Sequence, residues 1–226
     1  LSADGAEVDP YALTNDILFF LQKQGTPVYD QTTIETINHG RNGITLKTAA
    51  GHTIKCKKLV MACGYESQNY IPFKVCKLHS TYAIVSEPGG DKTWFEEAMI
   101  WETAMPYTYL RTTFDRRMVV GGADDPWYNP KKRDAVLPKK AKLLKHRFRK
   151  LMPHIAFDTD YMWAGTFAVT KDGLPFIGSI RQRPVTYFAL GYGGNGITFS
   201  MVAAAMLRDQ LMGKKNENAA IFQFGR

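Results

Sequence analysis

The chain has 226 residues, of which 45% are apolar, so its size and composition suit one large globular domain or two smaller ones. No apolar run is long enough to cross a bilayer, which excludes a predicted transmembrane helix. The cysteines (Cys56, Cys63 and Cys76) form no C-x-x-C pair, and the histidines show no metal-binding spacing. We therefore expect reduced cysteines, no metal site and a cytoplasmic location.

The formal net charge of +8 is concentrated in residues 131–150, which hold ten Lys/Arg residues and one acid, Asp134. Such a segment could bind nucleic acid or a membrane surface. It carries a well-formed apolar stripe, however, and Phe148, which stands among its charges, belongs to that stripe. We interpret the cations as a solvated outer face and expect neither nucleic acid nor a membrane as a partner.

The first part of the chain predicts a helix followed by a small β-meander and one strand. Asp9-Pro10 is typical of a helix start and Gly25 of a helix end, so a helix is expected over residues 10–24. The β-branched and alternating segments that follow predict short strands, with a turn at Asn42-Gly43. The apolar run Leu59–Gly64 is typical of a strand that is buried on both faces.

Residues 70–162 have a different texture, rich in aromatic residues and short alternating runs, and predict a mostly antiparallel sheet. A helix over about residues 138–151 is expected to interrupt it, with Pro138 in its first turn and Pro153 after its end. Beyond Trp163 the sequence predicts a loop, a strand at residues 187–190 and a helix at 197–212.

The glycine-rich turn Gly191–Gly196 lies between the last predicted strand and the last predicted helix. Glycines let a ligand approach the backbone, and the start of a helix offers free N–H groups and a positive dipole end. This combination suits a phosphate or the electron-rich edge of a flavin. Close packing of the strand against the helix is the alternative explanation for the same glycines.

In their order along the chain, several segments resemble the D-amino-acid oxidase/glycine oxidase superfamily of flavoproteins. The segments are Val8–Tyr11, Thr33-Ile34, Ala62–Gly64, Arg116–Gly122, Trp163–Gly165, Asp172–Pro175 and Gly191–Ser200. The resemblance implies an α+β fold, namely part of a glutathione-reductase-like FAD-binding domain with an inserted, mostly antiparallel substrate domain. We expect residues 1–68 and 163–226 to belong to the FAD-binding domain and residues 69–162 to form the substrate domain.

The resemblance also implies a set of residues beside the FAD cofactor. These are Thr33, Ile34, Ala62, Cys63, Gly64, Gly165, Gly194, Asn195, Gly196, Ile197 and Thr198. Family members bind the FAD pyrophosphate with a G-x-G-x-x-G turn near their N-terminus, and no such turn occurs near the N-terminus of this chain. We therefore expect a missing N-terminal FAD-binding segment, and a portion that is inactive and holds little or no FAD by itself.

Two departures from the family pattern bear on the substrate. Members that oxidise amino acids hold the substrate carboxylate with an arginine shortly after W-x-G, and the matching position here is Phe167. Asp124 follows a strand that faces the flavin in relatives, where a carboxylate could attract a cationic amine, although a solvated turn is the simpler interpretation. Tyr109 falls at a pocket position of the family, or is a packed tyrosine of the sheet.

By resemblance, the intact protein is expected to oxidise the C–N bond of an amine to an imine by hydride transfer to flavin. No side chain is required as a nucleophile, so we predict no certain catalytic residue. One alternative is an amino-acid or sarcosine-type oxidase in which another arginine, with Arg111 as the candidate, holds the carboxylate. The other is a binding module that has lost FAD.

Overall fold

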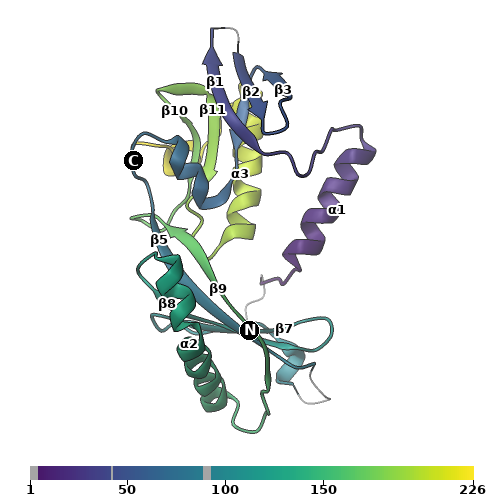
Figure 1. Cartoon of the computed structure of the whole chain (residues 1–226), viewed down its shortest axis with the longest axis vertical. Coiled ribbons are helices and arrows are strands. Elements are labelled where there is room, and N and C mark those ends of the chain that lie inside the picture. Colours follow the sequence, from purple (N-terminus) through teal and green to yellow (C-terminus); the bar gives the residue numbers. More distant parts are fainter. Residues whose placement is uncertain (1–4, 42, 89–92) are drawn as a thin grey trace. The chain divides into compact units, whose positions relative to one another are not determined.

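The computed structural model describes residues 5–41, 43–88 and 93–226. Mixed helix and sheet confirm the predicted α+β class, and the chain divides into two compact units (Figure 1). The first unit combines residues 1–70, 175–190 and 195–226, and the second combines 71–174 and 191–194. Trp163, where we expect the return to the FAD-binding domain, lies inside a strand of the second unit. The functional domain boundaries stay a prediction.

The first unit begins with α1 (Pro10–Lys23), close to the predicted bounds. The carboxylate of Asp9 accepts hydrogen bonds from the N–H groups of Tyr11 and Ala12, which caps the helix. Gly25 follows the helix end with a φ of +83°, a conformation that glycine adopts without strain. None of the side chains of α1 is buried in the structure.

An antiparallel meander follows, as predicted, in the order β1-β2-β3. Its strands are β1 (Ile34–Gly40), β2 (Gly43–Thr48) and β3 (Thr53–Cys56). The predicted turn residue Asn42 lies outside the described residues. Ile44 and Leu46 of β2 are buried, so one face of the meander contributes to the core of the unit.

A second sheet of the first unit has the order β10-β11-β4, with β11 and β4 parallel. Its strands are β10 (Phe176–Ile180), β11 (Arg183–Leu190) and β4 (Leu59–Met61). The prediction that the strand at residue 59 is buried on both faces is wrong. Val60 is 43% exposed, because β4 is the last strand of this sheet among the described residues. The helical elements of the unit are η1 (Gly64–Tyr70), α3 (Gly196–Leu211) and α4 (Ala219–Phe222).

The second unit is built on a five-stranded antiparallel sheet with the order β6-β7-β8-β5-β9, which confirms the predicted sheet. Its strands are β5 (Lys77–Ser86), β6 (Ile100–Trp101), β7 (Thr108–Thr112), β8 (Met118–Asp125) and β9 (Thr159–Val169). A short turn of 3-10 helix, η2 (Phe95–Glu97), precedes β6. β5 pairs with β9 along its whole length, so the segment around Trp163 belongs to this sheet.

The helix α2 (Pro130–Leu151) packs on one face of this sheet (Figure 1). Leu144 and Phe148 of α2 are fully buried against sheet residues that include Tyr82, Leu110 and Val120. Because side chains alternate along a strand, the neighbours of these sheet residues point to the opposite face. One face of the sheet therefore forms the core, and the other is available for a site.

The helix α2 starts eight residues earlier than predicted, and the placement of Pro138 in its first turn is wrong. Asn129 caps the helix by accepting a hydrogen bond from the N–H of Lys132 at 3.0 Å, and Pro130 is its first residue. Pro138 lies inside the helix, where it lacks the N–H that would bond to the preceding turn. The Asn129-Pro130 pair is itself a start signal, and the sequence analysis overlooked it.

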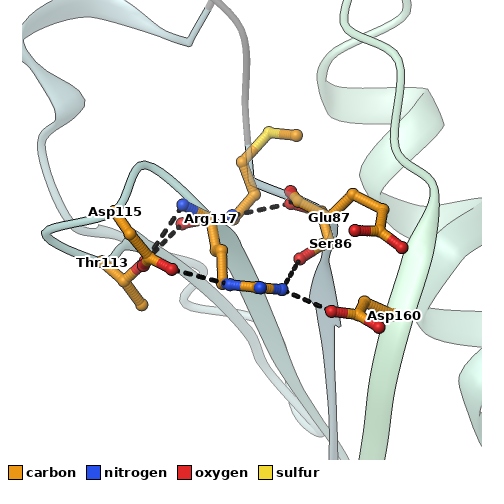
Figure 2. A network of polar contacts seen from close by, with 7 residues as sticks. Ser86, Glu87, Thr113, Asp115, Arg117 and Asp160 are labelled. Atoms are coloured by element: carbon orange, nitrogen blue, oxygen red, sulfur yellow. Dashed lines mark hydrogen bonds and ion pairs between the residues drawn. The ribbon is translucent and has the colours of Figure 1, made fainter.

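Arg117, at the start of the strand that resembles the family's D-G-R segment, ties the turn before β8 to the ends of β5 and β9 (Figure 2). Its guanidinium donates to Asp115 at 2.8 Å, to Asp160 at 2.6 Å and to the carbonyl of Ser86 at 3.0 Å. The hydroxyl of Ser86 in turn accepts from the N–H of Met118 at 2.9 Å. These bonds give Arg117 a structural role at the end of the sheet.

Candidate functional site

The predicted pocket residues lie on the face of the five-stranded sheet opposite α2, which we call the pocket face. The strand register places Trp101, Tyr109, Gly121, Ala83 and Trp163 in one row across this face. The side chains of the adjacent positions, such as those of Leu110 and Val120, belong to the core under α2. Tyr109, a predicted pocket residue, therefore shares a row with the exposed Trp101 and Trp163.

A glycine makes room for a tyrosine on this face. A Cβ atom added to Gly121 would lie 2.1 Å from the ring of Tyr109, so the ring lies directly over the Gly121 backbone. The rings of Tyr109 and Tyr107 have centroids 6.3 Å apart, and the ring of Trp101 is 5.7 Å from that of Tyr107. The strand β7 and the segment before it thus contribute a small aromatic cluster to the pocket face.

A β-bulge in β8 directs Asp124 to the pocket face. Between the pairs Tyr82–Gly122 and Ser80–Asp125, two residues of β8 stand opposite the single residue Thr81 of β5. Ala123, the first of the two, has a φ of +54° and packs in the core under α2. Asp124, the second, has its side chain on the opposite face, where it forms a hydrogen bond with Thr81.

The buried carboxyl group of Asp124 has few partners that offset the cost of its burial. Its Oδ1 atom is buried and has no hydrogen-bond partner among the described residues. Burial raises the pKa of Asp124, and Thr81, His79 and Lys140 only partly oppose this effect. A buried carboxylate oxygen without a donor can accept a hydrogen bond from a ligand, and it favours a ligand that carries positive charge.

The pKa values of the tyrosines show that Asp124 lies near both. Burial is the largest cause that raises the pKa of Tyr107 and of Tyr109, and the negative charge of Asp124 raises both further. The positive charge of Arg111 opposes this effect at Tyr109. Arg111 is two residues along β7 from Tyr109, and alternation therefore places both on the pocket face. A carboxylate and a guanidinium thus both act on one tyrosine.

Phe167 and His79 form the other side of the pocket face, on β9 and β5. They are register partners, and their rings meet edge to face with centroids 5.7 Å apart. His79 also lines a hollow of about 560 Å³ where β5 begins and β9 ends. Three lysines line the same hollow: Lys74, Lys77 and Lys171. Such a lining suits an anionic group, while Phe167 itself offers only an apolar surface.

The glycine turn after β11 packs against this unit. The N–H of Gly193 donates to the carbonyl of Ala168 at 3.0 Å, and a Cβ atom at Gly191 would come within 2.6 Å of the Thr170 side chain. A Cβ at Gly194, a predicted cofactor residue, would lie 3.0 Å from the hydroxyl of Tyr107. Close packing therefore explains Gly191, and Gly194 is next to the pocket residue Tyr107.

In the first unit, the predicted cofactor residues follow the carboxyl ends of two parallel strands. β4 and β11 run in the same direction with Met61 opposite Phe188, so both end at the same edge of their sheet. Gly64 follows β4 with a φ of +57° and no atom within 4 Å of a Cβ placed on it. Gly196 begins α3 and is equally open. Turns that leave one edge of a parallel sheet are a common place for a nucleotide ligand.

The start of α3 presents N–H groups that the helix itself does not bond. Asn195 precedes the helix without a side-chain cap, although its carbonyl accepts from the N–H of Phe199 at 3.0 Å. The N–H groups of the first turn, which includes Ile197 and Thr198, have no partner within the helix by the geometry of any α-helix. Open glycine backbone at Gly64 and Gly196 together with this uncapped turn fits a flavin cofactor.

The remaining predicted cofactor positions have local partners. The carbonyl of Thr33 accepts from the N–H of Ala49 at 2.9 Å, just before Ile34 starts β1. Cys63 is exposed after Ala62, and its N–H donates to the buried hydroxyl of Ser67 at 3.1 Å. All three cysteines are free. Gly165 of the second unit lies against Thr81, because a Cβ there would be 3.2 Å from the threonine methyl group.

The structure thus brings Tyr109, Asp124 and Phe167 onto one face of one sheet. The sequence analysis missed Tyr107, His79, Thr81 and Trp101 on the same face, although alternation from Tyr109 predicts the direction of Tyr107. Within residues 5–41, 43–88 and 93–226, no group of His, Cys, Asp and Glu side chains could hold a metal ion. No helix in these ranges is long and apolar enough to cross a membrane.

Comparison with known proteins finds one family and several relatives. The DAO family model, described as FAD dependent oxidoreductase, matches residues 1–210. Glycine oxidase of Bacillus subtilis (strain 168) is 24% identical over 219 residues, which cover 94% of this chain and 56% of that protein. Gamma-glutamylputrescine oxidoreductase of Escherichia coli (strain K12) is 28% identical over 106 residues, 46% of this chain and 23% of that protein.

Solved structures share the fold. The crystal structure of L-proline dehydrogenase from P. horikoshii matches with a TM-score of 0.77 at 22% sequence identity. The match covers 96% of this chain and 59% of that one. The chain therefore spans little more than half the length of the proteins that it matches across its own full extent.

Proposed function

Because this chain belongs to the DAO family of FAD-dependent oxidoreductases, we propose that the full-length protein oxidises the carbon–nitrogen bond of an amine to an imine. Bound FAD would accept the hydride that leaves the carbon beside the amine nitrogen. The residues of this chain would bind the substrate, hold its nitrogen in place and exclude water from the pocket face. No side chain among the described residues is assigned a covalent step.

The buried Oδ1 atom of Asp124 carries the proposal. It is a buried carboxylate oxygen with no donor among the described residues. The same face presents the tyrosine rings and the apolar surface of Phe167, together with Arg111, whose positive charge acts on Tyr109. An ammonium group supplies both the missing hydrogen bond and the missing positive charge. Tyrosine faces also attract cations, so Tyr107 and Tyr109 would support the same ligand. The substrate class that fits is an amine that is protonated when it binds.

By their names, one relative acts on glycine and another on gamma-glutamylputrescine. Amino-acid-oxidising members, by the resemblance, hold the carboxylate with an arginine at the position of Phe167. A phenyl ring cannot pair with a carboxylate, and an unpaired buried carboxylate costs at least about 1–3 kcal/mol. We therefore infer that the substrate lacks an obligatory α-carboxylate.

A panel of substrates tests this inference on the full-length enzyme. Simple amines, the amino acids that match them and amines with a distant carboxylate are compared by kcat/KM. We expect the amines to exceed the matched amino acids by about tenfold or more, a difference of about 1.4 kcal/mol. If amino acids win by the same margin, the inference fails, and Arg111 on the pocket face becomes the candidate partner of their carboxylate.

The cofactor would be held from the first unit by the open backbone at Gly64 and Gly196 and by the first turn of α3. The N-terminal half of the chain has no G-x-G-x-x-G turn for the pyrophosphate, so we expect the 226-residue chain to hold little or no FAD by itself. The visible absorbance of purified chain measures this directly. A stoichiometric flavin spectrum would overturn the expectation.

In the full-length protein, Gly64→Val should lower FAD retention by about tenfold or more, since the new side chain fills the open space over the backbone. Gly51→Val is the matched control. Gly51 lies in the turn between β2 and β3 and has a φ of +83°. As at Gly64, no atom lies within 4 Å of a Cβ placed on it. Equal flavin loss in both variants would indicate general destabilisation instead of a cofactor contact.

A further inference from the structure

The cations of α2 are not equivalent, and the interpretation of them as a solvated outer face is only partly correct. Arg133, Lys140 and Arg147, which we call the cation stripe, are half-buried, and each donates a hydrogen bond to the sheet. They are spaced by seven residues, about two helical turns, and therefore lie along one side of the helix. Lys139 and Lys142, between them in the sequence, are exposed.

Each bond of the stripe reaches a different strand. Arg133 donates to the hydroxyl of Thr166 on β9 at 2.9 Å. Lys140 donates to the carbonyl of Ala123 on β8 at 2.6 Å. Arg147 donates to the hydroxyl of Thr108 on β7 at 3.1 Å, and Thr108 is fully buried. The helix therefore fixes three strands of the sheet at once.

The three bonded residues immediately precede the three predicted pocket residues. Thr166 is followed by Phe167, Ala123 by Asp124, and Thr108 by Tyr109. Because side chains alternate between the faces, a residue that is held from the side of α2 is followed by one that points to the pocket face. The stripe thus bonds the residue directly before each predicted pocket residue. The bond reaches a backbone carbonyl at Ala123 and a side-chain hydroxyl at Thr166 and Thr108.

Lys140 makes several contacts, and they surround the backbone next to Asp124. Besides the Ala123 carbonyl, the ammonium group of Lys140 binds Oδ1 of Asp125 at 2.8 Å and lies 4.8 Å from the centroid of the Tyr82 ring. The Tyr82 hydroxyl donates to Oδ2 of Asp125 at 2.9 Å. One cation therefore fixes the residue before Asp124 and the residue after it.

The backbone at this point needs such support. An alanine with a φ of +54° is strained by about 1–2 kcal/mol, and a strained residue persists only where its surroundings hold it. Asp124 also keeps a buried oxygen without a donor, which favours its withdrawal to water. Lys140 opposes both tendencies, because it bonds on either side of Asp124.

We propose that the cation stripe positions the pocket from the opposite side of the sheet, with Arg133 acting on Phe167, Lys140 on Asp124 and Arg147 on Tyr109. The stripe residues touch no pocket ligand and are positioning residues. The proposal rests on the proposed function only for the use of the pocket. The geometry of the stripe is a property of the chain alone and is measured without flavin or substrate.

Nuclear magnetic resonance of the 226-residue chain tests the proposal through a one-to-one pattern. In Arg133→Gln, Lys140→Gln and Arg147→Gln, we expect the largest chemical-shift changes among pocket residues at Phe167, Asp124 and Tyr109 respectively. The exposed Lys142→Gln, with the same loss of charge from the same helix, should leave all three unchanged. Lys140→Gln should also raise the pKa of Asp124, measured on the carboxyl carbon, because the positive charge of Lys140 opposes its protonation.

Rescue distinguishes positioning from charge. Arg147→Lys keeps a donor for Thr108 and should preserve the Tyr109 signals that Arg147→Gln shifts. Pocket signals that do not move, or that move equally in all variants and in Lys142→Gln, would overturn the proposal. If Lys140→Gln does not fold, the Arg133 and Arg147 variants decide by the same criterion. A failed amine panel with an intact one-to-one pattern would reject the proposed function and leave the positioning role standing.

Discussion

Gly122→Ala is expected to destabilise the second unit by about 4 kcal/mol, among the largest effects of a single substitution. Gly122 has a φ of +123°, which side-chain-bearing residues rarely adopt. A Cβ atom at this position would lie 2.1 Å from the carbonyl oxygen of Tyr107. The obstacle is backbone of the adjacent segment, so it cannot rotate away as a flexible side chain could. Urea unfolding of the chain, followed by circular dichroism, measures the loss.

Gly173→Ala is the control for this experiment. Gly173 also has a positive φ, +75°, but no atom lies within 4 Å of a Cβ placed on it. Its substitution should cost only the backbone strain, about 1–2 kcal/mol. If both variants lose the same stability, the close approach of Tyr107 to the β8 bulge does not exist in solution, and the path by which β8 presents Asp124 is wrong.

Local signals made much of the fold predictable. Asp9-Pro10 predicts the start of α1 and Gly25 predicts its end. The structure contains the corresponding helix cap at Asp9 and the positive φ at Gly25. The strands of the meander follow from β-branched alternation. The start of α2 was also encoded, in Asn129-Pro130, but Pro138 offered a second start signal nearer to the apolar stripe. Competing signals of the same kind, eight residues apart, cannot be ranked by sequence alone.

The pocket could be predicted only in part, because it depends on register. Family resemblance predicted Tyr109, Asp124 and Phe167 as pocket residues. They lie on β7, β8 and β9, and β9 is far from the other two strands in the sequence. Whether Asp124 faces the pocket or a solvated turn depends on the bulge opposite Thr81, where one extra residue reverses the direction of a side chain. No local motif encodes that pairing.

The role of the cation stripe also could not be predicted from the sequence. Ten basic residues within twenty positions predict a surface feature, and most of them are exposed as expected. The seven-residue spacing of Arg133, Lys140 and Arg147 is visible in the sequence, yet it has meaning only once a sheet with polar acceptors lies beneath the helix. A basic segment can therefore combine cations that face the solvent with cations that bond the sheet beneath the helix.

Asp124→Asn should lower kcat/KM for the preferred amine by about tenfold to a hundredfold in the full-length enzyme. The substitution keeps the size of the side chain and removes its charge, and a hydrogen bond to a charged group is worth about 1.5–3 kcal/mol. The effect on uncharged substrate analogues should be small. Asp158→Asn is the control, because its side chain is 85% exposed and carries the same charge change in the same unit.

The pH dependence should change in a defined way. Burial raises the pKa of Asp124, so its carboxylate forms only at a higher pH than an ordinary aspartate requires. Wild-type kcat/KM should therefore rise with pH through this raised pKa, and rise further as the neutral amine that can be oxidised becomes available. In Asp124→Asn the first rise should be absent. The other charged groups near Asp124 are His79, Lys140 and Asp125, and they remain in the variant.

Stability should move in the opposite direction from activity. A carboxyl group whose pKa is raised by folding binds its proton more tightly in the folded state, so the folded state loses stability as pH rises from the unfolded to the folded pKa. Above that pH window the buried charge of Asp124 destabilises the folded state, so Asp124→Asn should raise the melting temperature at neutral pH. A structural aspartate would show the reverse, with lower stability and unchanged substrate preference. If Asp124→Asn is more stable and has lost its preference for amines, Asp124 binds the substrate and destabilises the fold. If the kinetics of the variant are unchanged, Asp124 does not contact the substrate.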